Sequence, residues 1–321
     1  MTERGISART FVLHAAVIGV LFAANFILPE YHRGVVSRVL VLAVFAMGYN
    51  LLFGYVGLLS LGHAMFFAAG LYGAGLPVYH FGWGVPAAFL SGIAAGAVLS
   101  LVVGALALRT TGVAFMIVTM MFAQVFYLLI YYYGSWTRGD EGLVLTQQMR
   151  QVSIGPLFFD LSDPSTRYMA ALLLFAVVLF VTLAMVRSAH GRVLVAIREN
   201  EERTRMLGYD AFANKLVATV VSGTVCAAAG AAYVLLFGYV GATFASIQYS
   251  ILPLLWVLLG GAATTLGPLT GTLFMYYVVD IASSYTSAWL LIVGVVLILL
   301  VLYFPKGILG TIRQRWIGWL P

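Results

Sequence analysis

Four polar side chains stand out in segments that are otherwise apolar: Asn50, Ser60, His63 and Gln124. Their amide, hydroxyl and imidazole groups exchange hydrogen bonds but do not form a reactive set. Two roles are open to them. They hold neighbouring helices together, with His63 fixing a break in its own segment, or they line a path along which a solute passes. We take these four residues as the candidate path.

The remaining residues offer no catalytic or metal-binding grouping. Only one cysteine is present, Cys226, and five histidines are scattered along the chain at positions 14, 32, 63, 80 and 190. Zinc sites need several such ligands at short spacings. Neither of the two lysines, Lys215 and Lys306, follows a glycine, so the chain has no Gly-Lys-Ser/Thr phosphate loop. We predict that the chain is not an enzyme and holds no metal or cofactor of its own.

The composition places these residues in membrane-spanning helices. Of the 321 residues, 62% are hydrophobic and 9% are charged, against roughly 25% charged in soluble domains. A water-soluble enzyme, a secreted domain and a nucleic-acid partner are therefore excluded. No charge occurs between Val39 and Leu108 or between Leu216 and Val279. A spanning helix needs roughly 20 residues, which predicts an all-α fold of about ten spans: 11–28, 36–53, 57–80, 85–108, 112–133, 168–186, 216–238, 249–262, 264–283 and 287–304.

The charges also predict the orientation. With ten spans both termini lie on one side, and this side receives twelve of the 17 Lys and Arg residues. Cytoplasmic loops carry the excess of basic residues, so we place both termini in the cytoplasm. The first apolar run, 11–28, is longer than a signal-peptide core and is interpreted as a retained helix. The eighth span, 249–262, is short and has the length of a half-helix.

One cytoplasmic segment, residues 187–215, is long and highly charged. Its stretch from about Val193 to Leu207 lacks Gly and Pro and is rich in helix formers. We expect a short cytoplasmic helix there that ends at Gly208.

The pentapeptide Phe-Gly-Tyr-Val-Gly occurs twice, at 53–57 and at 237–241. Each copy precedes a glycine-rich stretch, and the two copies end helices that run in opposite directions. This pattern predicts an inverted repeat with residues 36–133 and 216–304 as its halves, an arrangement typical of transporters with broken helices. A chance match of five common residues is the alternative.

Several blocks resemble the permease subunits of branched-chain amino-acid ABC importers of the LivM type. They cover nearly the whole chain after the first helix, and the Ala-Ile-Arg-Glu-Asn-Glu block at 196–201 is the most specific. Arg138, where glycine is usual, and Ala114, where an aromatic is frequent, depart from the pattern. The blocks are NLLFGYVGLLSLGHAMFFAAGLYGAG (50–75), RTTGVAFMIVTMMFAQ (109–124), TRGDEGL (137–143), 191–240, LLGGAATTLGPLTG (258–271) and LYFPKGILG (302–310).

The resemblance implies a type II-like importer permease in a bacterial inner membrane, forming one transmembrane domain over residues 1–321. Its partners would be a second permease of the LivH type, two ATPase subunits that bind the ATP, and an external binding protein. The charged segment would carry the coupling helix that docks on an ATPase, with Arg198, Glu199, Asn200, Glu201, Arg203 and Gly208 as its residues.

The predicted function is therefore import of a hydrophobic or branched-chain amino acid by ATP-driven alternating access. Two alternatives stay open. Permeases for urea, short amides or small aromatic acids have similar sequences, and a stand-alone channel would also suit an uncharged, glycine-rich core. The charged segment at 187–215 argues against the channel, in which it has no evident role.

Overall fold

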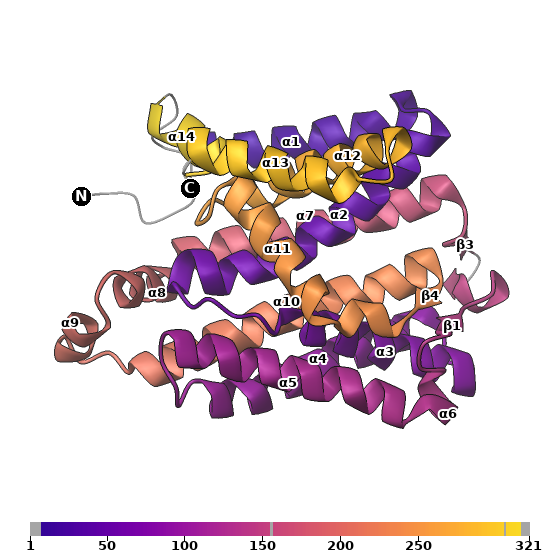
Figure 1. Ribbon diagram of the computed structural model, residues 1–321. Helices are drawn as coiled ribbons and strands as arrows, with labels where there is room; N and C mark the ends of the chain where they lie inside the picture. The colour runs from indigo at the N-terminus through magenta and orange to yellow at the C-terminus, as the bar shows by residue number, and fades with distance from the viewer. Residues whose placement is uncertain (1–7, 155–156, 305, 316–321) are drawn as a thin grey trace.

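The computed structural model describes residues 8–154, 157–304 and 306–315, and helices dominate it (Figure 1). Each predicted span coincides with a helix. In chain order the elements are α1 Ala8–Ile27, α2 Glu30–Asn50, η1 Leu51–Val56, α3 His63–Phe81, α4 Val85–Ala107, α5 Val113–Tyr132, α6 Gly134–Thr137, β1 Leu143–Val144, η2 Gln148–Arg150, β2 Gln151–Ile154, β3 Leu157–Asp160, α7 Pro164–Arg187, α8 Ala189–Glu199, α9 Glu201–Met206, α10 Ala211–Phe237, β4 Tyr239–Val240, η3 Ala242–Ala245, α11 Ile247–Gly260, α12 Gly267–Tyr285, α13 Trp289–Tyr303 and α14 Ile308–Arg315.

Six of the described helices are long and apolar enough to cross a membrane. They are Arg9–Ile27, Glu30–Val56, Val85–Ala107, Val113–Tyr132, Pro164–Arg187 and Ala211–Phe237. The helices α3 and α12 are not among these six, and α11 has only 14 residues. The short eighth segment is thus confirmed as a short helix.

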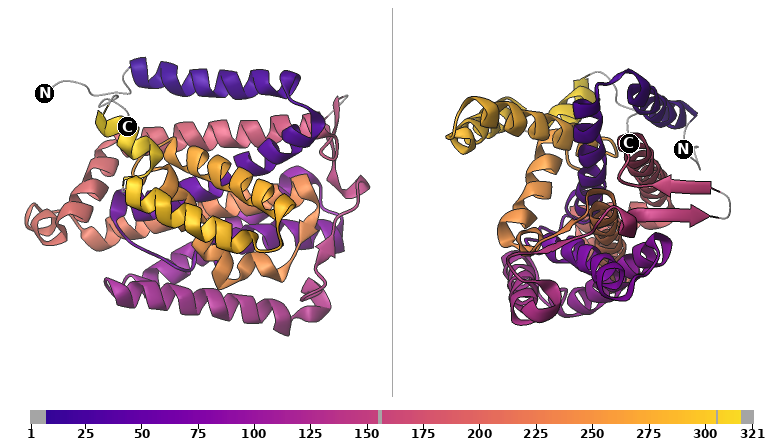
Figure 2. Two further views of the ribbon diagram at one scale, coloured as in Figure 1. Left: turned by 45° about the horizontal axis from the view of Figure 1, so that its top comes forward. Right: turned by 90° about the vertical axis from the view of Figure 1, so that its right-hand side faces the viewer.

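The molecule has two distinct ends. One end, called here the α8–α9 end, carries α8, α9, α14 and the beginning of α1 (Figure 1). The opposite end, called the strand end, carries α6 and four short strands. There β1 pairs with β4, and β2 pairs with β3 in a hairpin that projects from the helices (Figure 2, right). The sequence did not predict these strands.

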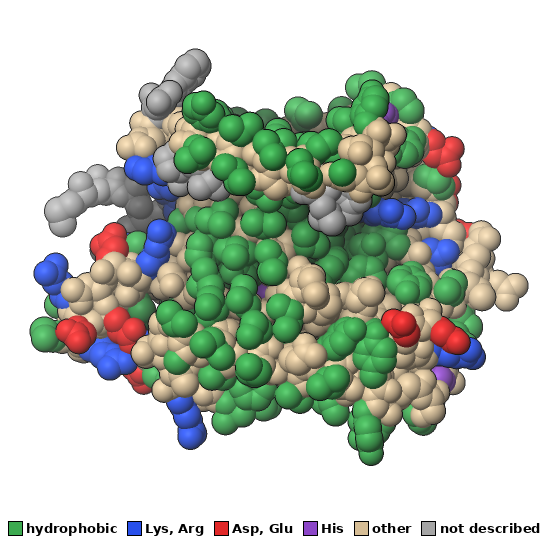
Figure 3. All heavy atoms as spheres, viewed as in Figure 1, with side chains coloured by type: hydrophobic (Ala, Val, Ile, Leu, Met, Phe, Trp, Pro, Cys, Tyr) green, Lys and Arg blue, Asp and Glu red, His purple; other side chains and the backbone are tan. Residues whose placement is uncertain are grey.

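Helices α2 and α10 form the centre of the bundle. Most of α2 is buried, and α10 packs against α2, α3 and α4. Glycines allow α3 and α10 to approach closely, because a Cβ at Gly70 would overlap the Ala227 carbonyl and a Cβ at Gly230 would overlap the Phe67 carbonyl. Such contact replaces the hydrophobic drive that lipid does not supply. Peripheral helices α1, α4, α5 and α7 expose apolar side chains. Apolar side chains also cover much of the face shown in Figure 3.

Two helices differ from the predicted boundaries at the first pentapeptide copy. The second span does not end at Phe53 but continues through a π-helical turn, η1, to Val56. The third begins only at His63, since residues 57–62 are not helical. The break in the predicted third span therefore lies at its beginning, next to Ser60 and His63.

Candidate functional site at the broken helices

Ser60 and His63 lie together at the beginning of α3 in a buried hydrogen-bonded chain. His63 is 1% exposed, and its ring nitrogens Nδ1 and Nε2 each lie 3.0 Å from a serine Oγ, of Ser60 and Ser222 respectively. The Ser222 hydroxyl donates to the Gly48 carbonyl at 2.6 Å, so it accepts from Nε2–H and leaves Nδ1 to accept from Ser60. This chain ties α3 to α10 and α2. His63 thus fixes the break between η1 and α3.

Asn50 connects the two interrupted regions of the chain. Its Nδ2 donates to the Thr264 carbonyl at 2.9 Å, and its Oδ1 accepts from the Ala263 amide at 3.0 Å. Asn50 is 1% exposed and ends α2, whereas Ala263 and Thr264 lie in the irregular segment 261–266 between α11 and α12. We call this pair of bonds the Asn50 clamp. It gives hydrogen-bond partners to a backbone amide and a carbonyl of this irregular segment, which would otherwise be buried without them.

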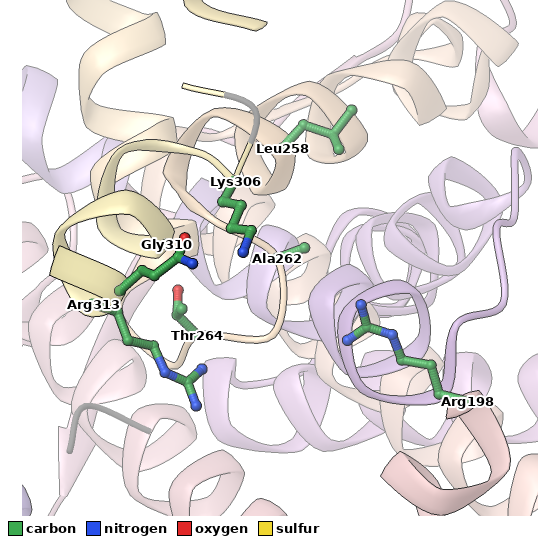
Figure 4. A pocket seen from close by; sticks show the side chains of 8 residues that line it. Arg198, Leu258, Ala262, Thr264, Lys306, Gly310 and Arg313 are labelled. Atoms are coloured by element: carbon green, nitrogen blue, oxygen red, sulfur yellow. The ribbon is translucent and has the colours of Figure 1, made fainter. Parts of the chain in front are cut away.

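Two arginines join the clamp to the helices of the α8–α9 end. Arg198 of α8 donates from Nη1 to the Gly54 carbonyl at 2.5 Å, and Arg313 of α14 donates from Nη1 to the Ala263 carbonyl at 3.2 Å. The two side chains line a cavity of about 530 Å³ together with Lys306 and Thr264 (Figure 4). The interrupted segments are therefore attached to surface helices through their carbonyl groups.

The charged segment is not the single helix that the sequence predicted from Val193 to Leu207. It forms α8 and α9, separated at Asn200, whose backbone is extended (φ −160°). The Asn200 Oδ1 accepts from the Arg203 amide at 2.8 Å, so Asn200 is the N-cap of a new helix. Gly208, at φ +88°, follows the end of α9 as predicted.

A buried lysine fixes α9 to the bundle. Lys215 of α10 is buried, and its Nζ lies 2.8 Å from Glu201 Oε1, which also accepts from Arg205 at 2.6 Å. Burial opposes ionisation of Glu201, but the hydrogen bonds and positive charges of Lys215 and Arg205 outweigh it. The pKa of the Glu201 carboxyl is therefore held below its ordinary value. Sequence reasoning did not assign Lys215 to the site, because its partner is 14 residues away.

The structure divides the predicted coupling residues into two groups. Arg198, Asn200 and Glu201 bind groups within the chain, whereas the side chains of Glu199 and Arg203 are exposed. The tip of the segment also exposes two apolar residues that the sequence did not single out, Met206 (84%) and Leu207 (71%).

The structure does not bring Gln124 into this cluster. It lies half-buried on α5 and forms no hydrogen bond with the described residues. Thr119, five residues earlier, reaches the break instead, because its Oγ1 accepts from the Leu61 amide at 3.3 Å. Ser250 of α11 contributes a further contact by accepting from the Ala64 amide at 3.0 Å.

Comparison with known proteins relates this arrangement to transport. The family model for the permease component of branched-chain amino acid transport systems matches residues 31–302. The high-affinity branched-chain amino acid transport system permease protein LivM of Salmonella typhimurium is 26% identical over 335 residues, covering 97% of this chain and 77% of that protein. LivM of Escherichia coli K12 is 26% identical over 332 residues, which again cover 97% of this chain and 77% of that protein.

A more distant match is the probable branched-chain amino acid transport permease protein LivM of Methanocaldococcus jannaschii, which is 26% identical over 141 residues, or 39% of this chain and 41% of that protein. No solved structure gives a significant match.

The family match extends over most of the chain and confirms the resemblance seen in the sequence. It includes the Asn50 clamp, both pentapeptide copies and the charged segment. The family consists of transporter permeases, so the chain is a multi-pass membrane protein and not an enzyme. This chain belongs to the family of permease components of branched-chain amino acid transport systems.

Proposed function

We propose that this chain moves a branched-chain amino acid inward across a bacterial cytoplasmic membrane. It would act with a second permease subunit, two ATPase subunits and an external binding protein. The family match and the names of the Salmonella and Escherichia relatives support this substrate class. The ATP would be bound by the partner ATPases.

The α8–α9 end is assigned to the cytoplasm. Seven of the 17 Lys and Arg residues lie in α8, α9, α14 and the beginning of α1 at this end, and Arg187, Lys215 and Lys306 lie next to these helices. Cytoplasmic segments of membrane proteins carry the excess of Lys and Arg. The strand end then faces the exterior, where the binding protein would dock, and ten crossings follow from the order of the helices.

The observation that carries the mechanism is the hydrogen bond from Arg198 to the Gly54 carbonyl. It links the charged segment directly to η1, and η1 follows Asn50, whose side chain holds segment 261–266. A force applied to α9 by an ATPase would pass through α8 and Arg198 to both interrupted regions. One interrupted region lies within residues 36–133 and the other within residues 216–304, which we propose as the two halves that move against each other.

The proposed docking surface is formed by exposed side chains of α9 and of the residue that follows it: Glu202, Arg203, Met206 and Leu207. Two exposed apolar residues flanked by both signs of charge suit a protein contact with a polar rim. Arg198 and Glu201 do not belong to this surface, because their partners lie within the chain.

The experiment reconstitutes the complete importer in proteoliposomes and measures ATP-dependent uptake of radiolabelled leucine. Met206→Ser combined with Leu207→Ser should weaken ATPase binding at least tenfold and abolish uptake. Val144→Ser, at the strand end and 62% exposed, is the matched control and should retain ATPase binding. Unchanged ATPase binding by the double variant would refute the docking surface, and leucine uptake without ATP would favour a facilitator.

A further inference from the structure

Arg38 is a charged side chain in a helix that is otherwise enclosed. From Val35 to Leu52 every residue is buried except Arg38, which is exposed. It lies eight residues after the beginning of α2 at Glu30, about 12 Å along the helix axis. A charge within a membrane-spanning helix is costly and marks a functional site by default.

A second arginine faces the same place from another helix. The guanidinium of Arg167, in the first turn of α7, lies 5.7 Å from the ring centroid of Phe237, and the guanidinium of Arg38 lies 5.3 Å from it. Arg150 approaches the same helix end by donating from Nη1 to the Leu236 carbonyl at 3.1 Å. Three arginines from distant parts of the sequence therefore meet at the end of α10.

Among the described residues, no carboxylate forms an ion pair with these three arginines. The ion pairs found there are Arg138–Glu141, Arg205–Glu201 and Lys215–Glu201. The nearby carboxylates of Asp160 and Asp163 accept from Gln147 and from the backbone of residues 162 and 166. Within the part of the chain that the structure describes, the buried Nε groups of Arg150 and Arg167 have no hydrogen-bond partner. The arginine cluster therefore has an excess of positive charge and unused donors.

A cavity of about 460 Å³ opens at this cluster. Its volume is typical of small-molecule sites, which measure about 300–1,000 Å³. Arg38 and Arg167 line it together with Glu30, Tyr31 and Tyr276. The Tyr31 hydroxyl donates to Asp280, so its ring serves as a wall, whereas Glu30 carries an exposed carboxylate. Figure 3 shows basic side chains exposed in the hollow at the strand end.

We propose that this cavity receives the amino acid, with Arg38 and Arg167 binding its α-carboxylate and Glu30 its α-ammonium group. Two guanidinium groups offer forked donors that match a carboxylate, and the acidic residue lies on the same helix two turns toward the exterior. The inference rests on the proposed function and sharpens it. A substrate with a carboxylate fits the cavity, whereas urea and short amides leave the arginines unpaired.

The first test measures binding of leucine to the assembled importer in nanodiscs without the binding protein, by saturation-transfer NMR. Isocaproate retains the carboxylate but lacks the ammonium group, and isoamylamine retains the ammonium group alone. We expect leucine to bind best, isocaproate to compete more weakly, and isoamylamine to compete least. Equal competition by isoamylamine and isocaproate would overturn the assignment of the arginines, as would displacement of leucine by phosphatidylglycerol but not by isocaproate.

The second test removes each charge. Arg38→Gln and Arg167→Gln should each weaken leucine binding about tenfold to hundredfold, and Arg38→Lys should restore part of it. Arg138→Gln, an exposed arginine at the same end that pairs with Glu141, is the matched control. Size-exclusion chromatography checks that each variant assembles. If Arg38→Gln and Arg167→Gln bind leucine as well as Arg138→Gln does, the proposal is wrong.

Failure of the proposed function gives a different result. If the wild-type importer takes up no leucine, isoleucine or valine, the substrate class of the proposed function fails, whatever the variants do. If the wild-type importer takes up leucine and both variants retain its full affinity, only the role of the arginines fails.

Discussion

The two pentapeptide copies are identical in sequence and different in structure, and the identity extends to seven residues, Leu51–Gly57 and Leu235–Gly241. The first copy forms the π-helical turn η1, which ends at Val56 and is capped by Gly57 (φ +80°). The second ends α10, with Gly238 at φ +75°, and continues as the strand β4. Identical residues thus place their left-handed glycine at different positions, so the difference must come from outside the seven residues.

The residue before each copy explains much of the difference. Asn50 precedes the first copy, and its side chain binds segment 261–266, whereas Val234 precedes the second and packs in the core. Beyond the copies, Arg198 donates to Gly54 in one case, and in the other β1 pairs with Tyr239 and Val240. A turn in this bundle is therefore determined by polar partners from distant segments.

The substitution Gly54→Ala tests how closely the first copy is packed, and we expect it to have the strongest effect. A Cβ at Gly54 would overlap Asn50 Oδ1 and lie 2.6 Å from the Ala263 amide. Gly54→Ala should therefore break the Asn50 clamp and destabilise the protein by about 3 kcal/mol, measured by unfolding in mixed micelles. Gly19→Ala is the matched control, because no atom of the described residues lies within 4 Å of its Cβ position. Equal stability of both variants would show that the clamp does not constrain η1.

The substitution Asn50→Val tests whether Asn50 causes the structural difference between the two copies, and we expect a weaker effect. Asn50→Val gives the first copy the same preceding residue as the second. It leaves the Ala263 amide and the Thr264 carbonyl without their partner, at a cost of about 2 kcal/mol. We expect faster hydrogen exchange in segment 261–266, measured by mass spectrometry. Asn25→Ala, which removes a single long bond of 3.3 Å to Ser165, is the control. Unchanged exchange at 261–266 would contradict this role.

Substitution of the two left-handed glycines, Gly57 and Gly238, should have smaller effects that differ between the two copies. Gly57→Ala and Gly238→Ala each place a side chain at positive φ, which costs about 1 kcal/mol. Only the Cβ at Gly57 lies close to Arg198, 2.8 Å from its Cγ. We expect similar losses of thermal stability but different activities. Gly57→Ala should hydrolyse ATP with reduced leucine uptake, and Gly238→Ala should retain the ratio of uptake to hydrolysis. Equal ratios in both variants would argue against transmission through Arg198.

The sequence predicted the helices well, because apolar length and the absence of charge directly reflect the bilayer. It was less informative about polar contacts. Asn50 was identified as a candidate, but its partners lie more than 200 residues away, and no periodicity indicates such a pairing. Gln124 was chosen by residue type, although Thr119 lies on the face of α5 that contacts the break. Arg38 was not singled out, because the second span was predicted to begin at residue 36, only two residues before it, whereas α2 begins at Glu30.

The smallest effect concerns the attachment of α9 next to the first copy. The folded-state pKa of Glu201 lies below its ordinary value of 4.5, because Lys215 and Arg205 favour the carboxylate. A carboxyl with a depressed pKa contributes stability that is present above its unfolded pKa and is lost as the pH falls through the folded value.

We therefore expect hydrogen exchange in α9 to increase, after correction for intrinsic rates, as the pH is lowered from 5 through this range. Glu201→Gln should remove the pH dependence, whereas Glu202→Gln, whose side chain is exposed, should retain it. A pH dependence that persists in Glu201→Gln would show that another group holds α9 to α10, and Arg198 would then be the main attachment of the charged segment to the first copy.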